Sequence, residues 1–555
     1  MSRGSGAVYS SANATGGTGG DISGGLNFNF GTPSGGGASA SSTATSGSGN
    51  ASSSANASGG MGGDNVSQEE TNHAGAGGSA DASSSAVSSG SGGAVSSAVA
   101  AGGSGKGSDF GGAGGDASAS STATSRGSGG ALSSANASGG VGGDGFGAFG
   151  FLGGGGAGGG AGATSTAASS GAGNVTSSAT ATGSTGGDFS GGLDAAGGGG
   201  AGGGAGATST AASSGAGNVT SSATATGGAG GELTFGEVPG FAGGDGGDAT
   251  ATANASAAGG GTAIAKAVAT GGVGGGGESP PGALGAATAT SSAETAKGAL
   301  AQAQSTAFGS SGEAESTAKT SLAGISVQST AVAPTNGDTA TTDAIAQGGS
   351  GQAFANPGQT AYAFSTGLPN KAYAATLIGG ANNVANALLG PSDKVFGTAI
   401  LGANYAPDGG GASLTYSASS TFDFAHVGDL QLGLIDSQET GFANSLGFES
   451  MEFTIIANGV EILDSTFRSL AVAESFFHDD VIDLGSSLGP DVDLTFNYNL
   501  VADGSGGFGF DLAVGGAVSD TVPEPSTWAM MLLGFAGLAF AGSRRAKAGD
   551  APLAR

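Results

Sequence analysis

The chain has 555 residues, 123 of them glycine, and its 41 acidic and 13 basic side chains give a formal net charge of −28. This negative charge disfavours binding to nucleic acid and to anionic lipid headgroups, because both are polyanions. The absence of cysteine excludes disulfides, thiolate metal sites and a cysteine nucleophile.

Residues 1–277 consist of low-complexity repeats rich in glycine, alanine, serine and threonine. The stretch Gly153–Gly183 recurs unchanged at Gly197–Gly227. A shorter unit within it begins at Gly4, Gly47, Gly90, Gly127, Gly171, Gly215 and Gly259. Successive starts lie 43, 43, 37, 44, 44 and 44 residues apart, a regularity that biased composition alone does not produce.

Two interpretations of the repeats are open. Alanine occupies alternate positions in Ala249–Ala257 and Ala263–Ala269, which on a strand places alanine on one face and polar residues on the other. Such strands, separated by glycine-rich turns, would stack into a β-solenoid with about three coils of roughly 15 residues per repeat. Alternatively, the repeats bury too little apolar area to offset their chain entropy and form a disordered, flexible stalk.

Residues 278–351 are richer in glutamate, lysine and glutamine and form a transition or linker. Within them, Thr290–Ala307 is compatible with a helix or with continued alternation of alanine.

Residues 352–520 have the pattern of an antiparallel β-sandwich of jelly-roll type. Fourteen of the 26 phenylalanines lie between Phe354 and Phe510, which provides an aromatic core. Only Ser469–Asp479 has a helical pattern. The predicted strands are Thr360–Leu368, Lys394–Tyr405, Ser413–Ala425, Met451–Leu463 with a hairpin turn at Asn458-Gly459, Asp491–Ala502 and Phe508–Val514.

One face of the strand Asp491–Ala502 is apolar, and it carries Val492, Leu494, Phe496, Tyr498 and Leu500. A Gly/Ser turn after this strand is expected to return the chain through Phe508–Val514.

The C-terminal region contains a short apolar run, Trp528–Ala541, that predicts a transmembrane helix. Extended from Pro525 to Gly542, the helix reaches about 27 Å, slightly less than the hydrocarbon core of a bilayer. Arginine and lysine after the run predict a cytoplasmic end for residues 548–555. The membrane residues are Trp528, Met530, Met531, Leu532, Leu533, Phe535, Leu538 and Phe540, and the basic stop is Arg544, Arg545 and Lys547.

Immediately before this helix stands Val522-Pro523-Glu524-Pro525. Together, the Pro-Glu-Pro motif, the short apolar helix and the basic cluster over residues 521–547 resemble the PEP-CTERM sorting signal of Gram-negative bacteria. The resemblance implies export, an intermediate held in the inner membrane by the C-terminal helix, and recognition by an exosortase, a membrane protease. It also implies release to the outer surface or extracellular matrix, and an association with exopolysaccharide and biofilm.

An exported protein of this kind is expected to begin with a secretory signal peptide, and residues 1–17 have no apolar segment. Because Ser2–Gly6 matches Ser125–Gly129, the chain opens inside a repeat. We therefore expect a signal peptide in sequence upstream of Met1.

Two groups of residues are candidates for metal binding. The pattern GGxGxD at Gly16–Asp21, Gly59–Asp64 and Gly139–Asp144 resembles half of a calcium-binding nonapeptide, but it recurs too far apart for tandem turns to share an ion. The second group is His478, Asp479, Asp480 and Asp483, with His426 on another predicted strand. For both groups, surface carboxylates without a metal are the simpler interpretation.

The sequence contains no Ser/His/Asp order, nucleophile elbow or paired-carboxylate signature. We therefore expect no catalytic or cofactor-binding residues and predict a structural protein of the cell surface or exopolysaccharide matrix, with an extended repeat stalk. An alternative is a carbohydrate-binding or adhesive sandwich with the repeats as spacer, and a more remote one is an extracellular hydrolase.

Overall fold

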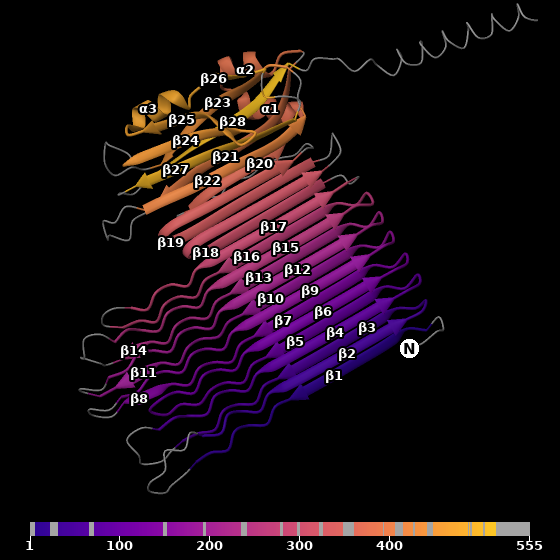
Figure 1. Ribbon diagram of the computed structural model, residues 1–555, viewed down its shortest axis with the longest axis vertical. Helices are drawn as coiled ribbons and strands as arrows, with labels where there is room; N and C mark the ends of the chain where they lie inside the picture. Colours follow the sequence, from indigo (N-terminus) through magenta and orange to yellow (C-terminus); the bar gives the residue numbers. More distant parts are fainter. Residues whose placement is uncertain are drawn as a thin grey trace, which may run out of the picture.

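Two parallel β-sheets lie face to face in the repeat region, and an antiparallel sandwich continues them at one end (Figure 1). The computed structural model describes residues 6–22, 32–65, 72–147, 152–192, 196–234, 241–277, 281–296, 300–320, 326–347, 360–391, 393–405, 414–425, 428–440, 448–486, 488, 491–502 and 506–517.

Each repeat contributes one strand to each sheet. The first sheet, called sheet B, contains β1 (Val8–Thr15), β3 (Ala51–Ser58), β5 (Ala94–Ala101), β7 (Ala131–Ser138), β10 (Val175–Thr182), β13 (Val219–Thr226) and β16 (Ala263–Thr270). The facing sheet, called sheet A, contains β2 (Ala38–Ser46), β4 (Ala80–Ser88), β6 (Ala117–Ser125), β9 (Ala161–Ser169), β12 (Ala205–Ser213), β15 (Ala249–Ala257) and β17 (Ala287–Thr295).

Parallel register joins equivalent residues of successive repeats. Ala161 pairs with Ala205, which is 44 residues further along, and Val8 pairs with Ala51, which is 43 residues further. One coil is therefore one whole repeat, and the prediction of three short coils per repeat is wrong. The described repeat residues take the stacked β arrangement rather than the disordered alternative.

Alanine and serine fill the narrow space between the two sheets. Ala211 and Ala223 are almost fully buried, and alternate residues point outward. In most coils a serine of each sheet meets a serine of the other at 2.8–2.9 Å; the pairs are Ser42–Ser53, Ser84–Ser96, Ser121–Ser133, Ser165–Ser177, Ser209–Ser221 and Ser291–Ser305. In the next coil, Ala253 and Ala265 occupy the positions equivalent to Ser209 and Ser221, so that coil forms without the serine–serine hydrogen bond.

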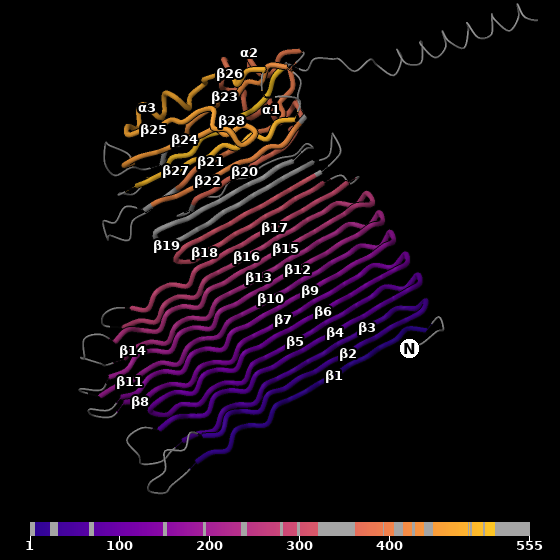
Figure 2. The backbone as a smooth tube through the Cα atoms, in the orientation of Figure 1, coloured from indigo at the N-terminus to yellow at the C-terminus, as the bar shows by residue number. Residues whose placement is uncertain are grey.

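Glycine-rich segments continue the strands and run side by side across the molecule (Figure 2). Successive N–H groups of such a run point to different neighbours: Gly59 donates to the next coil in the same layer, and Gly60 donates to the facing layer. The alternation repeats at Gly62 and Gly63, while the intervening Met61 is 43 % exposed. A repeat of three residues per turn, with backbone hydrogen bonds to neighbouring segments and none within the run, is characteristic of polyproline II conformation.

Close backbone contact explains why two of every three residues in these runs are glycine. A Cβ on Gly203 would lie 2.0 Å from the carbonyl oxygen of Gly159, and one on Gly60 would lie 1.9 Å from that of Gly17. The third position points outward and accepts larger side chains such as Met61. These runs, which the sequence suggested were turns, are extended packing elements, and they account for the unexpected length of each coil.

At the far end of the runs, three short strands form a small parallel sheet, β8 (Gly145–Gly147), β11 (Phe189–Gly191) and β14 (Leu233–Thr234). Phe189 is fully buried there against Leu233 and Phe241. The coils are consequently wide, and the repeat region is a two-layer slab rather than the thin stalk that we expected (Figure 1).

Two long strands join the slab to the sandwich. β18 (Leu300–Thr320) pairs with β16 along its first part and with β17 along its second, so it passes from sheet B into sheet A. β19 (Ser326–Gln347) repeats this course and pairs with strands of the sandwich in both sheets. The region 278–351, expected to be a linker, thus holds three strands of the stack among its described residues. The described residues of Thr290–Ala307 are strand apart from a bend at Ala296, and none of them is helical.

The sandwich extends both sheets with antiparallel strands. Sheet B continues through β20 (Thr360–Gly367), β21 (Asp393–Tyr405), β28 (Gly506–Ala517), β23 (Leu430–Thr440) and β26 (Asp480–Gly485). Sheet A continues through β22 (Leu414–Ala425), β27 (Asp491–Ala502), β24 (Ser450–Ala457) and β25 (Val460–Phe467). From β21 onward, this order and its crossing connections are those of a jelly roll.

Aromatic side chains form the core of the sandwich, as the sequence indicated. The five predicted core residues of β27 are all buried. Phe453 lies 5.3 Å from both Phe477 and Phe510, measured between ring centroids. The predicted hairpin turn is present, with positive φ at Asn458 and Gly459.

Two local expectations were wrong. β27 and β28 do not form a hairpin, because they lie in opposite sheets. Besides α3 (Leu470–Phe476), where a helix was predicted, the structure has α1 (Lys371–Ile378) and α2 (Asn382–Leu388). α1 and α2 cover the outer face of sheet B with Ile378, Val384 and Leu388.

We predict that Gly203→Ala destabilises the slab, because the added methyl cannot fit between the glycine runs. The expected loss is several kcal/mol, in the range of severe overpacking. Gly206→Ala is the matched control, since a Cβ there meets nothing within 4 Å. Calorimetric unfolding measures both variants, and equal transition temperatures would contradict the packing model.

We also predict that Ser209→Ala alone costs about 1–2 kcal/mol, because it leaves the buried hydroxyl of Ser221 without its partner. Replacing both serines by alanine should cost less than the sum of the single changes, as the natural pair Ala253 and Ala265 indicates. A double-mutant cycle of unfolding free energies tests this, and strictly additive losses would show that the two serines do not stabilise the fold through their hydrogen bond.

Candidate functional site

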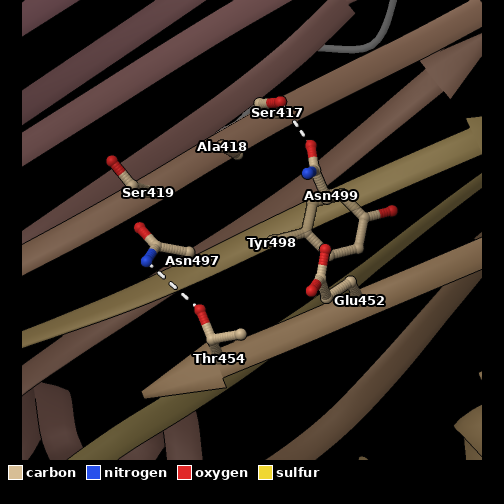
Figure 3. A pocket seen from close by; sticks show the side chains of 8 residues that line it. All are labelled: Ser417, Ala418, Ser419, Glu452, Thr454, Asn497, Tyr498 and Asn499. Atoms are coloured by element: carbon tan, nitrogen blue, oxygen red, sulfur yellow. Dashed lines mark hydrogen bonds between the residues drawn. The ribbon is translucent and has the colours of Figure 1, made fainter. Parts of the chain in front are cut away.

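A shallow hollow of about 350 Å³ lies on the outer face of sheet A, within the sandwich. Three neighbouring strands, β22, β27 and β24, form it. Its lining consists of Ser417, Ala418, Ser419, Glu452, Thr454, Asn497, Tyr498 and Asn499. The outward side chains carry hydroxyls, amides and one carboxylate, and Figure 3 shows them side by side on the sheet.

Cross-strand pairs hold these side chains in rows. Asn497 donates to the Thr454 hydroxyl at 3.2 Å, and Ser417 donates to the amide oxygen of Asn499 (Figure 3). Tyr498 points inward and donates its hydroxyl to the Phe508 carbonyl at 2.7 Å, so it forms part of the floor. Burial raises the pKa of the Tyr498 phenol well above its usual value, and it stays protonated.

The hollow is suited to hydrogen bonding with a ligand that carries many hydroxyls. Glu452 is the only carboxylate in its lining, whereas glycoside hydrolysis commonly uses two. The sequence analysis singled out none of these residues. Alternating polar residues in β22 and β27 were visible in the sequence, but their adjacency to β24 depends on the jelly-roll order.

A second polar group lies on the outer face of sheet B. Asp511 on β28 pairs across the sheet with Asp436 on β23 and is only 9 % exposed, and its Oδ1 atom has no hydrogen-bond partner within the described residues. Burial, together with the nearby Asp436, raises the pKa of Asp511 to about 6. Burial and Asp511 likewise raise the pKa of Tyr362 to about 12.

The described side chains around His478 contact different parts of the protein. His478 Nδ1 lies 3.4 Å from Asp436 Oδ1, and both side chains are mostly exposed. Asp479 instead caps α2, because its Oδ1 atom accepts the N–H groups of Asn383 at 2.8 Å and Val384 at 3.2 Å. Oxygens of Asp480 and Asp483 accept backbone N–H groups near them in sequence, and His426 lies outside the described residues.

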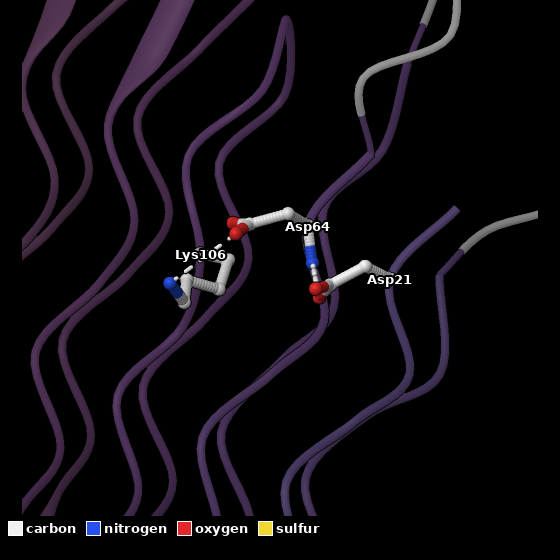
Figure 4. Close-up of polar contacts among 3 residues, drawn as sticks. All are labelled: Asp21, Asp64 and Lys106. Atoms are coloured by element: carbon white, nitrogen blue, oxygen red, sulfur yellow. Dashed lines mark hydrogen bonds and ion pairs between the residues drawn. The ribbon is translucent and has the colours of Figure 1, made fainter. Parts of the chain in front are cut away.

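The aspartates of the GGxGxD pattern contact residues of neighbouring coils. Asp21 Oδ1 accepts the N–H of Asp64 at 2.9 Å, and Asp64 in turn lies 3.3 Å from Lys106 Nζ (Figure 4). Asp144 accepts the N–H of Asp188 in the same way. In the part of the chain that the structure describes, no three acidic or histidine side chains are grouped as metal ligands.

The sorting signal predicted at Val522–Pro525, the helix from Trp528 and the basic stop through Lys547 lie outside the described residues. None of the helices in the described ranges combines the length and hydropathy that a membrane span requires.

Comparison with known families gives one match, to the PEP-CTERM protein-sorting motif, over residues 521–545. The match confirms the C-terminal resemblance and covers only this end of the chain. The motif implies that the protein is exported and processed by an exosortase, with a membrane-anchored intermediate. No curated protein and no solved structure matches the chain.

We predict that Asp511→Asn stabilises the protein at pH 8 but has little effect near pH 4. Because the folded state raises the pKa of Asp511 above its unfolded value, the folded protein loses stability as the pH rises from about 4 through about 6. A shift of this size corresponds to roughly 3 kcal/mol. Calorimetry at both pH values measures the difference in unfolding free energy between Asp511→Asn and the wild type, and Asp464→Asn at an exposed position is the control. A difference that is the same at pH 4 and pH 8 would contradict the raised pKa of Asp511.

Proposed function

We propose that the protein is an exported, exosortase-processed structural component of the cell surface or exopolysaccharide matrix. The sorting motif at residues 521–545 supports delivery to the outside. The architecture supports the structural role, since most of the described chain is a continuous stack of strands and glycine runs joined by backbone hydrogen bonds.

The observation that carries this proposal is the unbroken pairing from the repeats into the sandwich through β18 and β19. A stack of this kind transmits force through many parallel hydrogen bonds, and directly paired strands connect β17 to β22 through β18 and β19. Its acid-rich composition keeps separate copies apart in solution and attracts counter-cations. A rigid, repetitive and acidic element suits a hydrated matrix better than it suits a catalyst.

A second candidate function is carbohydrate binding or adhesion by the sandwich. The hollow lined by Ser419, Thr454 and Asn497 favours it, because hydroxyl and amide groups on a rigid sheet match the hydrogen-bonding groups of sugars. The two functions are compatible, since a matrix protein that binds its polysaccharide also reinforces it.

We predict that the chain, expressed with a secretory signal peptide before Met1 and together with an exosortase, yields an extracellular product that has lost the C-terminal segment containing Trp528. Replacing Pro523, Glu524 and Pro525 together by alanine should leave the full-length chain in the membrane fraction. Ser526→Ala serves as the control inside the same segment. Cell fractionation with intact-mass measurement distinguishes the outcomes, and an intracellular, unprocessed wild-type chain would refute the proposal.

A further inference from the structure

One column of register partners connects the sandwich hollow to the outer face of the slab. In the hollow, Thr454 pairs with Asn497, and Asn497 pairs with Ser419. Pairing continues through β19 and β18 to β17 and then from coil to coil. The complete column is Thr454, Asn497, Ser419, Asp343, Glu315, Thr290, Thr252, Thr208, Thr164, Ser120, Ser83 and Ser41.

The slab part of this column is a straight array of hydroxyls. Every member from Thr290 to Ser41 is serine or threonine. They point outward because the alternating alanines, such as Ala163 and Ala207, fill the space between the sheets. At the usual spacing of strands in a sheet, about 4.8 Å, the whole column extends over roughly 50 Å.

A second column, two residues along each strand, has the same character. It runs from Thr43 through Ser85, Thr122, Thr166, Thr210 and Asn254 to Ser292. No member of it is charged, although the whole chain carries a net charge of −28. Within the slab, from Ser41 to Thr290 and from Thr43 to Ser292, the two columns therefore form a neutral lattice of hydrogen-bonding groups in an acidic protein. Toward the sandwich, the first column passes through two acidic register positions, Glu315 and Asp343.

This geometry selects a particular kind of ligand. A regular array of donors and acceptors suits a polymer whose own hydroxyls recur at a similar distance, as they do in an extended, linear polysaccharide. The absence of charge in the lattice favours a neutral polymer over an ionic one. Single hydroxyl contacts are weak in water, but contacts in series on one chain act together.

We propose that the hollow and the two columns form one continuous surface that binds a single extended, neutral polysaccharide chain. The hollow is the end of this surface, and the slab is its main length. The repeats are then part of the binding site and not a spacer. The proposal rests on the matrix function only for the choice of ligand, and the localisation experiment tests export independently of it.

The test compares a long neutral polymer with a short oligosaccharide on the intact chain. Hydroxyethyl cellulose and a neutral galactomannan serve as polymers, a cello-oligosaccharide that spans only the hollow serves as the short ligand, and carboxymethyl cellulose serves as the anionic comparison. We expect each neutral polymer that binds to bind at least about tenfold more tightly than the short ligand. The anionic polymer should bind more weakly than its neutral counterpart.

Variants locate the surface. Thr208→Val with Thr252→Val removes two hydroxyls from the column with little change of shape, and it should weaken polymer binding about tenfold while the short ligand is unaffected. Asn497→Ala should weaken both ligands. The matched control is Thr220→Val with Thr224→Val, which makes the same change on the outer face of sheet B and should have no effect.

Three results would overturn the proposal: no binding to either neutral polymer, equal affinity for polymer and oligosaccharide, or equal losses from the sheet A and sheet B variants. Circular dichroism of each variant confirms that the stack is intact.

Discussion

Contact between glycine backbones of neighbouring coils is the constraint on which the structure depends. At positions such as Gly60 and Gly203 the carbonyl oxygen of another coil occupies the place of a Cβ atom, so hydrogen bonds in several directions replace side-chain packing. Ordering glycine is entropically costly, and a buried alanine methyl contributes only about 0.8 kcal/mol. The fold is therefore stable only as a stack, in which each coil satisfies the backbone groups of the next.

The sandwich and the slab are joined where the glycine runs end. No glycine run separates the two halves of β18 or of β19, so each of these strands passes directly from sheet B into sheet A. Both sheets therefore continue without a break into the jelly roll. The sandwich thereby covers strand edges that would otherwise be free to pair with other chains at this end. Functionally, continuity gives the exported protein a rigid, broad face whose hydroxyl columns lead into the hollow beside Asn497.

Much of the fold follows from local patterns in the sequence. Alternating alanine in Ala249–Ala257 identifies strands with a small-residue core, and Asn458-Gly459 identifies a hairpin turn because both residues tolerate positive φ. The width of a coil did not follow, since Gly-Gly-Xaa is compatible with turns, disorder or polyproline II conformation. Which one forms depends on other segments of the chain that donate and accept its hydrogen bonds. Those segments are distant in sequence: Gly60 donates to Gly36, 24 residues before it, and Gly59 donates to Ala101, 42 residues after it.

The sequence by itself identified the sorting motif at residues 521–545, because the parts of this motif follow one another directly along the chain. It also determined which residues of β27 face the core, since a strand alternates its faces whatever its partners are. Only the tertiary structure decided that Ser419, Asn497 and Thr454 share a row, and that the buried Asp511 faces Asp436. These residues come from strands that meet through crossing connections, and strand order is set by how the two sheets pack rather than by any local pattern.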